Sequence, residues 1–308
     1  MTTRAVVFGY HDVGVRCLET LLSGGVDVPL VVTVREDPTE TQWFGSVAAT
    51  AAEYGIETVM PADPNTPDLQ QRLTELQPDF IFSFYYRSLL GASLLRTARV
   101  GALNMHGSLL PKYRGRAPVN WAVLHDEPET GATLHYMVDR ADAGDIVDQL
   151  AVPILRNDDA LAVFRKVTVA AEIILARSLP GLIAGTAPRY TQPVESGQYF
   201  GRRRPEDGRI DWTWSAQQIH NLVRAVAPPF PGAYATVGEQ RWFIHKTRVV
   251  PQTTAPSAQA RLVSVDGQCY VECCDGSVLH LIKVASQEGP LILRGLAAAL
   301  ANHPRLLS

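Results

Sequence analysis

The chain of 308 residues contains few cysteines, which occur as Cys17, Cys269, Cys273 and Cys274. Adjacent cysteines do not match the usual spacing of disulfides, so the sequence argues against a secreted disulfide framework. The stretch from Cys269 to His280 has residue types that bind zinc, but it alternates like a β-hairpin with Asp275-Gly276 as its two-residue turn. We therefore expect a structural hairpin there and no metal site.

Long apolar runs are also missing, since the strongest, such as Phe80 to Tyr86, fall far short of the ~18 residues that span a bilayer. The start at Met1 lacks the charged and apolar regions of a signal peptide. Neither sign of charge dominates, with 28 Lys and Arg against 31 Asp and Glu and a net charge of −3. This balance argues against a protein that coats nucleic acid. We expect a cytosolic protein without membrane insertion.

Two common site signatures are absent from the sequence. Gly9 and Gly14 lack the G-x-G-x-x-G spacing of a dinucleotide site, so we expect a tight turn that packs a helix on a strand. No histidine has a ligand-like partner spacing, so we expect packing or surface roles for His11, His125 and His135. The simplest role for a further aromatic set is to form core or pocket walls: Trp43, Phe84, Tyr85 and Tyr86.

The first half of the chain alternates strand-like and helical runs, which is typical of a doubly wound, mostly parallel α/β sheet. The expected strands are 4–8, 28–34, 58–60, 80–85 and 100–105. The expected helices are one after Gly14 that ends near Gly24, then 44–54, 68–76, 88–96 and 158–179, the last closed by Pro180, Gly181 and Gly185. The pattern predicts a Rossmann-like catalytic domain over residues 1–200.

The second part of the chain begins after a polar segment, 191–211, which we interpret as a linker. Beyond it the pattern predicts a helix at 215–226, a breaker at 228–232 and short alternating strands to about residue 285. We therefore expect a small OB-like β-barrel domain over residues 201–308. Three arginines at its start are either a grip for a diphosphate or a solvated run: Arg202, Arg203 and Arg204.

Polar side chains suited to acyl transfer lie at the end of the expected strand 100–105. Ligands bind at this edge of open α/β sheets, and side chains two residues apart, such as those of Asn104 and His106, project to the same side. An amide donor beside an imidazole can stabilise an oxyanion and protonate a leaving group. Asp142 is the candidate carboxylate that would favour the protonated imidazole. The alternative is that Asn104 and His106 only cap a loop.

The stretch 104–118, Asn-Met-His-Gly-Ser-Leu-Leu-Pro-Lys-Tyr-Arg-Gly-Arg-Ala-Pro, and the downstream stretch 133–144 resemble the signature of the folate-dependent formyltransferases. The resemblance implies that Asn104 binds the formyl oxygen, His106 donates a proton and Asp142 keeps His106 protonated. It implies 10-formyltetrahydrofolate as the formyl donor, without a metal. It places this donor against Ser88, Leu89, Leu90, Arg116, Val138, Asp139, Arg140, Ala141 and Asp142.

Along almost its entire length the chain is similar to family members that act on UDP-4-amino-4-deoxy-L-arabinose. The similarity rests on residues 8–14, 44–46, 81–87, 106–121, 134–147, 200–203, 223–226 and 231–233. It implies formylation of the 4-amino group of a UDP-linked amino sugar. Formyltransferases of other nucleotide-linked amino sugars remain an alternative, as does a non-catalytic folate-binding protein, which the intact Asn104, His106 and Asp142 disfavour. The oligomeric state stays open.

A methionyl-tRNA formyltransferase is the other alternative within the family. Such an enzyme needs a basic surface for the phosphates of tRNA. Here the segment 34–44 is net acidic, where the tRNA enzymes resembled carry a basic insertion, and the chain from residue 207 has no lysine cluster. We therefore expect a nucleotide-sugar substrate and no productive nucleic-acid partner.

Overall fold

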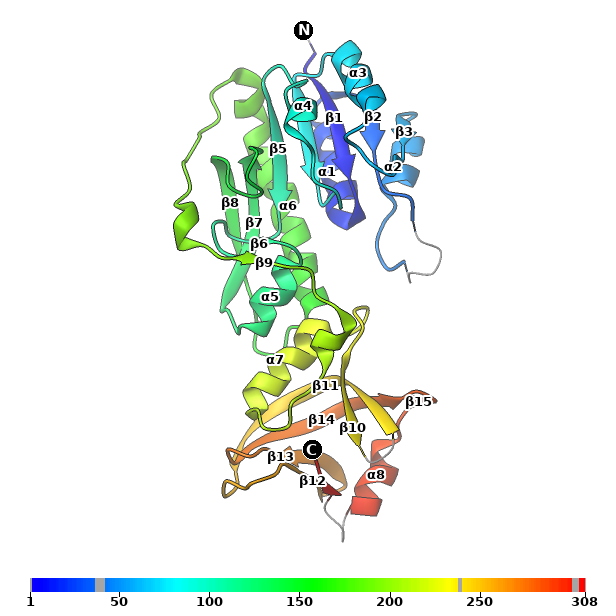
Figure 1. Ribbon diagram of the computed structural model, residues 1–308, viewed down its shortest axis with the longest axis vertical. Coiled ribbons are helices and arrows are strands. Elements are labelled where there is room, and N and C mark those ends of the chain that lie inside the picture. Colours follow the sequence, from blue (N-terminus) through cyan, green and yellow to red (C-terminus); the bar gives the residue numbers. More distant parts are fainter. Residues whose placement is uncertain (1, 37–41, 238–239, 301–304, 308) are drawn as a thin grey trace. The chain divides into compact units, whose positions relative to one another are not determined.

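The computed structural model describes residues 2–36, 42–237, 240–300 and 305–307 (Figure 1). Part of the acidic segment, residues 37–41, lies outside the described residues. The chain divides into two compact units. Unit 1 comprises Met1–Pro118, Glu129–Pro153 and Phe164–Gly201, and unit 2 comprises Val119–Pro128, Ile154–Val163 and Arg202–Ser308. Two short stretches from the first 200 residues, 119–128 and 154–163, thus belong to unit 2.

A central sheet with strand order β3-β2-β1-β4-β5-β7-β8 forms unit 1. Its strands are β1 (Arg4–Gly9), β2 (Asp27–Val32), β3 (Glu57–Val59), β4 (Phe80–Phe84), β5 (Gly101–His106), β7 (Glu129–Tyr136) and β8 (Ile146–Pro153). Strands from β3 to β5 pair in parallel, whereas β7 is antiparallel to both β5 and β8. The predicted doubly wound, mostly parallel sheet is confirmed, with strand ends shifted by one or two residues.

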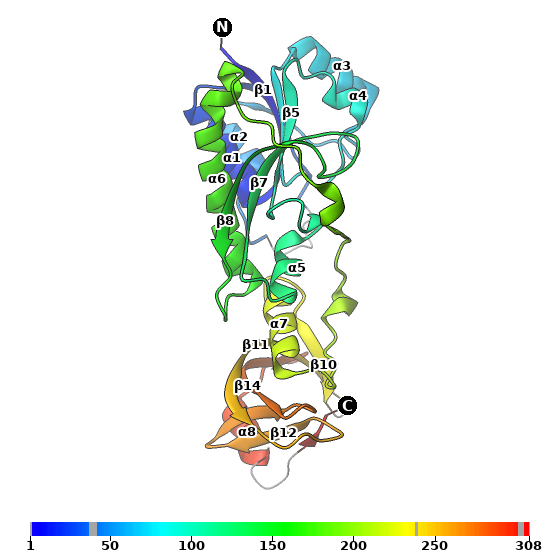
Figure 2. The same cartoon turned by 90° about the vertical axis from the view of Figure 1, so that its left-hand side faces the viewer.

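Helices cover both faces of this sheet because its central strands are buried on both sides. Figure 2 shows α1 and α6 on one face, and α3 and α4 on the other. The bounds are α1 (His11–Ser23), α2 (Val47–Glu53), α3 (Pro67–Leu76), α4 (Ala92–Leu95) and α6 (Ala160–Ala184). Local sequence defines two of the starts, since Ser46 and Thr66 cap α2 and α3 by accepting from backbone N–H groups.

The helix predicted over 88–96 is wrong for its first half, because α4 begins only at Ala92. Asn65 explains the difference. Its Nδ2 donates to the Leu89 carbonyl at 3.0 Å, and its Oδ1 accepts from the Gly91 N–H at 2.6 Å. These bonds hold residues 88–91 as a loop, because backbone groups bonded to a distant side chain are not free to form helical bonds.

The predicted end of the long helix is also wrong, because α6 continues through Pro180 to Ala184. Leu179 and Leu182 on either side of Pro180 are buried. Their packing offsets the backbone hydrogen bond that proline cannot donate. The helix ends before Gly185, whose φ of +69° is the left-handed conformation that glycine adopts readily.

By length and composition α6 is apolar enough to cross a membrane, which differs from the expected lack of long apolar runs. In unit 1, however, Glu172 forms an ion pair with Arg16 of α1, and Arg177 forms one with Asp148 of β8. Its buried side chains include Val167. These contacts pack α6 against α1 and β8, and by length and composition alone it is weak evidence for a membrane span. The cytosolic location stays a prediction.

The tight turn predicted between β1 and α1 is confirmed. A side chain added at Gly14 would place its Cβ 2.8 Å from Val47 Cγ2 and 3.2 Å from the Gly9 carbonyl carbon. Glycine therefore lets α1 approach the end of β1 and the start of α2 more closely than any other residue would allow.

Unit 2 contains a curled antiparallel sheet with strand order β10-β11-β14-β13-β12-β16, and β15 pairs with β14. Its elements are α5 (Pro118–Leu124), α7 (Ala216–Val226), β10 (Ala233–Val237), β11 (Gln240–Thr253), β12 (Arg261–Val265), β13 (Gln268–Glu272), β14 (Ser277–Ser286), β15 (Gly289–Pro290), α8 (Leu293–Leu300) and β16 (Arg305–Leu306). The sheet is a half-barrel, which confirms the predicted small β domain (Figure 1). The hairpin through Cys269 and Gly276 is present, and the described residues contain no group suited to hold a metal ion.

The segment 191–211, expected to be a linker, carries its own structure. Within unit 1, β9 (Tyr199–Phe200) pairs in parallel with β6 (Arg114–Gly115). Short 3₁₀ turns occur at Val194–Ser196 and Pro205–Gly208. Part of this polar stretch therefore has regular backbone structure of its own.

Replacing Gly14 by alanine should lower the free energy of unfolding of unit 1 by about 1–3 kcal/mol, as expected for overpacking. Urea denaturation followed by circular dichroism measures the change. Gly201→Ala is the control, because a Cβ at Gly201 meets nothing within 4 Å. Equal stabilities of the two variants would contradict the close packing around Gly14.

Candidate active site

Asn104 and His106 lie at the carboxyl end of β5, where the sheet changes from parallel to antiparallel pairing. In the register of β5 and β7, Asn104 is opposite His135 and His106 is opposite Thr133. Side chains directly opposite in an antiparallel pair lie close together. The two strands therefore bring two histidines and an asparagine to one place, and Asp142 approaches from the turn between β7 and β8.

Both ring nitrogens of His106 face polar groups, and its side chain is only 7% exposed. Nε2 lies 2.9 Å from the Tyr113 carbonyl oxygen, to which its N–H donates a hydrogen bond. Nδ1 lies 3.5 Å from Asp142 Oδ1. The backbone therefore orients the ring through Nε2, and Nδ1 faces the carboxylate of Asp142.

Buried polar side chains hold the loop that contains the Tyr113 carbonyl. Thr133 Oγ1 donates to the Ser108 carbonyl at 2.6 Å and accepts from the Leu110 N–H at 3.1 Å. Gln149 Nε2 donates to both Thr133 Oγ1 and the Leu110 carbonyl, at 2.9 and 2.8 Å. Side chains of β7 and β8 therefore position the acceptor that orients His106.

Asp142 is held in a left-handed conformation with φ of +53°. Its Oδ2 accepts from the Gly115 N–H at 2.9 Å, and its carbonyl accepts from Gln192 Nε2 at 3.2 Å. Burial alone would raise the pKa of Asp142, but the imidazoles of His106 and His135 and the Gly115 N–H bring it below the ordinary value. Asp142 is therefore an ionised carboxylate at neutral pH, next to both rings.

His135 is the site residue that the sequence reasoning missed. A packing or surface role was expected for it, but His135 is buried with its Nε2 3.1 Å from Asn104 Nδ2 and 3.7 Å from Asp142 Oδ1. Burial lowers its pKa to about 4, although Asp142 acts in the opposite direction. The sequence shows that His135 and Thr133 lie two residues apart and so on one face of a strand. It does not show that His135 pairs with Asn104, because this depends on the register of β5 and β7.

The residues expected to contact the donor are brought together in part. Leu90 and Met137, which precedes Val138, both pack against one core cluster of unit 1. Arg116 reaches the loop, since its Nη2 donates to the Arg87 carbonyl at 3.3 Å. Arg140 instead forms an exposed ion pair with Glu195 at 3.0 Å.

Two apolar side chains in these segments are solvent-exposed. Leu89 is 72% exposed and Val138 is 48% exposed. Exposed apolar side chains of this kind can pack against a flat ring such as a pterin. The loop residues are therefore chemically suited to the donor that the resemblance implies.

The three arginines expected near the linker belong to unit 2. Arg203 lies over the Trp121 ring, 4.7 Å from its centroid, and its Nη2 donates to the Asp207 carbonyl at 2.9 Å. Burial lowers the pKa of Arg203, with Asp207 opposing the shift. The Arg204 N–H donates to the Asp207 carboxylate at 2.6 Å. These bonds give Arg203 and the Arg204 backbone structural partners within unit 2.

His11 has the packing role that was expected. Its ring stacks on Phe44 at 3.9 Å between centroids and meets Trp43 and Phe164 edge-on. Burial lowers its pKa to about 3, with Arg87 adding to the shift. His11 is therefore a neutral member of an aromatic cluster.

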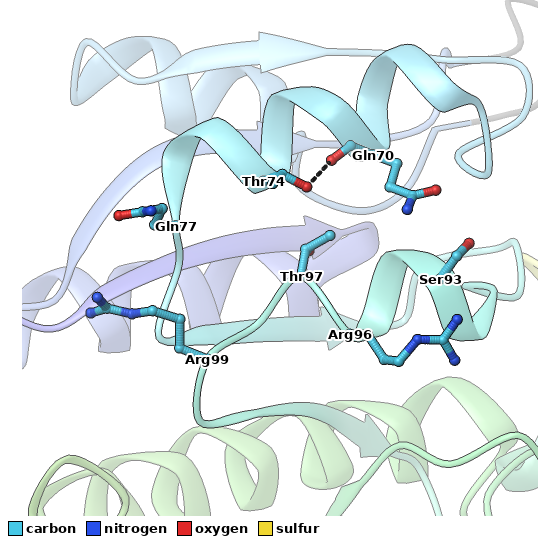
Figure 3. Close-up of a pocket in the computed structure, with 7 residues that line it drawn as sticks. All are labelled: Gln70, Thr74, Gln77, Ser93, Arg96, Thr97 and Arg99. Carbon is cyan, nitrogen blue, oxygen red and sulfur yellow. Dashed lines mark hydrogen bonds between the residues drawn. The ribbon is translucent and has the colours of Figure 1, made fainter.

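A polar pocket of about 380 Å³ lies between α3 and α4, away from the site (Figure 3). Its lining includes Gln77 and Arg99, which precede β4 and β5 in the chain. Asn104 and His106 follow at the other end of β5, so the pocket reaches the opposite edge of the sheet. The pocket is lined by Gln70, Thr74, Gln77, Ser93, Arg96, Thr97 and Arg99.

Two family models match the chain. The model described as formyl transferase matches residues 3–179, and that of the formyl transferase C-terminal domain matches residues 203–292. Together they cover both the strand end that carries Asn104 and the half-barrel of unit 2 as far as β15.

Several solved structures have the same fold. The N-formyltransferase from Helicobacter canadensis, in complex with folinic acid and dTDP-3-aminofucose, is 21% identical over 91% of this chain and 99% of its own, with a TM-score of 0.72. WlaRD, a sugar 3N-formyl transferase, is 19% identical over 95% of this chain and 99% of its own, with a TM-score of 0.72. A 4-N formyltransferase from Francisella tularensis is 20% identical over 76% and 92%, with a TM-score of 0.60.

Acid should destabilise the fold through His135. Its pKa falls from 6.5 to about 4 on folding, so between these values the unfolded chain binds a proton that the folded chain does not. Stability therefore declines as pH falls through this window and is unaffected above it. Between pH 7 and pH 4, the free energy of unfolding of the wild type should fall by up to about 3 kcal/mol more than that of His135→Gln. Urea denaturation at each pH measures it. Parallel losses in the two proteins would contradict the neutral state of His135.

Proposed function

This chain belongs to the formyl transferase family, and we propose that it transfers the formyl group of 10-formyltetrahydrofolate to the amino group of a nucleotide-linked amino sugar. The observation that carries the proposal is the cluster of Asn104, His106 and Asp142 at the end of β5. An amide donor, an imidazole and a buried carboxylate are the groups that acyl transfer to an amine requires. Both the family and the chemistry of the cluster support this reaction.

Asn104 is assigned to the developing oxyanion. The sugar amine attacks the formyl carbon, a C–N bond forms, and the former carbonyl oxygen becomes negatively charged. The side-chain N–H of Asn104 donates to that oxygen. Such donors lower the barrier because they are already oriented before charge develops.

His106 is assigned to the proton that the leaving N10 of the folate takes up as its bond to the formyl carbon breaks. The Tyr113 carbonyl occupies Nε2, so Nδ1 is the atom that carries the mobile proton. Asp142 Oδ1, 3.5 Å away, favours the protonated ring. The proton lost by the amine goes to Asp142 or to a water beside it.

The donor is proposed to lie against Ser88, Leu89, Leu90, Arg116 and the turn 138–142. Leu89 and Val138 offer exposed apolar surface against which the flat pterin ring would pack. When bound, the folate supplies the activated formyl group. The protein positions it and excludes water from the reacting carbon.

For the acceptor we propose UDP-4-amino-4-deoxy-L-arabinose, formylated at its 4-amino group. Support comes from the similarity of this chain to the formyltransferase module of the bifunctional polymyxin-resistance protein, over segments from residue 8 to residue 233. That assignment connects the protein to lipid A modification. The solved relative in complex with dTDP-3-aminofucose supports the wider class of nucleotide-linked amino sugars. Arg202, Arg203 and Arg204 remain proposed contacts of the diphosphate.

Methionyl-tRNA formylation is disfavoured by charge. The net charge is −3 and the segment 34–44 is net acidic in sequence, whereas a tRNA acceptor requires a basic surface. A nucleotide sugar carries far fewer phosphates and makes no such demand.

A panel of acceptors tests the proposed reaction. The protein is incubated with 10-formyltetrahydrofolate and UDP-, dTDP- or GDP-linked amino sugars, or initiator methionyl-tRNA, and products are identified by mass. We expect a formyl adduct on a UDP-linked 4-amino sugar. The variant Arg96→Ala, in the polar pocket between α3 and α4, should give the same product at the same rate. Formylation of the tRNA in preference to every sugar would overturn the substrate assignment.

The pH dependence of turnover separates the roles of Asn104 and Asp142. Asn104→Ala removes an oxyanion donor, so turnover should fall by roughly 10²–10³ at every pH. Asp142→Asn removes the charge that favours protonated His106. Without that charge the proton on Nδ1 is attracted less strongly, so turnover should fall by more at pH 8 than at pH 6.

Turnover of Asn104→Ala and Asp142→Asn is measured against pH with saturating donor and acceptor, and the shapes of the two profiles are compared. A loss in Asp142→Asn that is equal at every pH, or near-normal turnover in His106→Ala, would remove His106 from the role of proton donor.

A further inference from the structure

We propose that His135 is a positioning residue that holds the side-chain amide of Asn104 with an N–H, and not its carbonyl oxygen, directed to the reacting group. This inference rests on the proposed function, because it explains how the assigned oxyanion donor is oriented. His135 would act only through Asn104 and would not touch the substrate.

A backbone carbonyl determines which ring nitrogen of His135 carries the proton. Nδ1 lies 2.8 Å from the carbonyl oxygen of Tyr136. A carbonyl can only accept, so Nδ1 carries the proton. In the neutral ring Nε2 then has a lone pair and no proton. His135 is therefore a hydrogen-bond acceptor on the side that faces Asn104.

The unprotonated Nε2 of His135 determines the orientation of the Asn104 side-chain amide. Nε2 of His135 lies 3.1 Å from Asn104 Nδ2, which donates to it. Rotating the amide by half a turn would bring its carbonyl oxygen against the Nε2 lone pair, with loss of the bond and repulsion in its place. The amide nitrogen carries two protons. One is held by His135, and the other remains available for the oxyanion.

This orientation of the Asn104 amide depends on the protonation state of His135. Protonation of Nε2 would turn it into a donor and favour the inverted amide. The charged groups near the ring are Asp142, 3.7 Å from Nε2, and His106 beside it on β5, whereas Ile146 pairs with it on β8. Asp142 favours the protonated ring, but burial and His106 oppose it and keep the pKa at about 4. The acceptor state therefore persists at neutral pH.

The backbone around His135 supports the same arrangement. The pairing of β7 with β8 shifts register between Leu134 and His135, an irregularity that re-aims a side chain. The Tyr136 carbonyl, which fixes Nδ1, faces the turn between β7 and β8. A Cβ at Gly144 would overlap that oxygen, so glycine lets the turn lie against it. Asn104, His135 and the Tyr136 carbonyl are thus connected by short, directed bonds.

Two substitutions of matched purpose test the proposal kinetically. His135→Phe keeps a buried ring without an acceptor, and His135→Gln keeps an acceptor oxygen near the position of Nε2. We expect His135→Phe to lower kcat by about 10- to 100-fold, part of the ~10²–10³ that follows complete loss of an oxyanion donor. KM for both substrates should change little. His135→Gln should recover most of the loss, and His280→Gln in unit 2 serves as the histidine control.

Combining His135→Phe with Asn104→Ala decides between positioning and a general structural role. If His135 acts through Asn104, the second substitution should add little to the first, because the interaction they share is already lost. Losses that multiply, or a His135→Gln variant as slow as His135→Phe, would overturn the proposal.

A measurement without turnover keeps this inference separate from the proposed function. In protein labelled with ¹⁵N in histidine and asparagine, the ring of His135 should show a protonated Nδ1 and a bare Nε2 at pH 7. The Asn104 amide signals should shift in His135→Phe and return towards their wild-type positions in His135→Gln. A protonated Nε2, or unchanged amide signals in His135→Phe, would refute the positioning role whether or not any acceptor is formylated. Absence of turnover with the expected spectra would refute the proposed function alone.

Discussion

Burying the carboxylate of Asp142 costs free energy, and groups from three separate segments compensate for that cost. The Gly115 N–H comes from β6, His106 from β5 and His135 from β7. Each of these groups needs its own support: the Tyr113 carbonyl orients His106, and the Tyr136 carbonyl orients His135. The site is therefore a set of directed bonds around one negative charge, and removing that charge would change the environment of both rings at once.

The sheet provides the geometry that this arrangement needs. Parallel strands from β3 to β5 end at a common edge, and β7 returns antiparallel to β5, so its side chains meet those of β5 in direct pairs. A parallel strand in the place of β7 would have paired with β5 in a different register. The change of strand direction thus brings His135 opposite Asn104 and leads into the turn that carries Asp142.

The sequence predicted the sheet well because its strands are short apolar runs between clear turn residues, as for β1 and β4. It failed where a distant side chain decides the local structure, as Asn65 does for the loop before α4. Asn104, His106 and Asp142 were found through a motif, and their roles stay a prediction. His135 was missed because spacing along the chain does not reveal which residue lies opposite in an antiparallel pair. Pro180 within α6 shows the same limit, since the burial of its neighbours outweighs a local preference.

Asn65 also affects how a ligand would be received at the loop 88–91. Its side chain bonds to the Leu89 carbonyl and the Gly91 N–H, so the backbone on both sides of the exposed Leu89 side chain is already ordered. A ring that covers Leu89 then has little loop entropy to remove on binding. Calorimetry of binding should therefore show a negative heat-capacity change in proportion to the apolar area covered. The larger change that accompanies folding of a segment on binding should be absent.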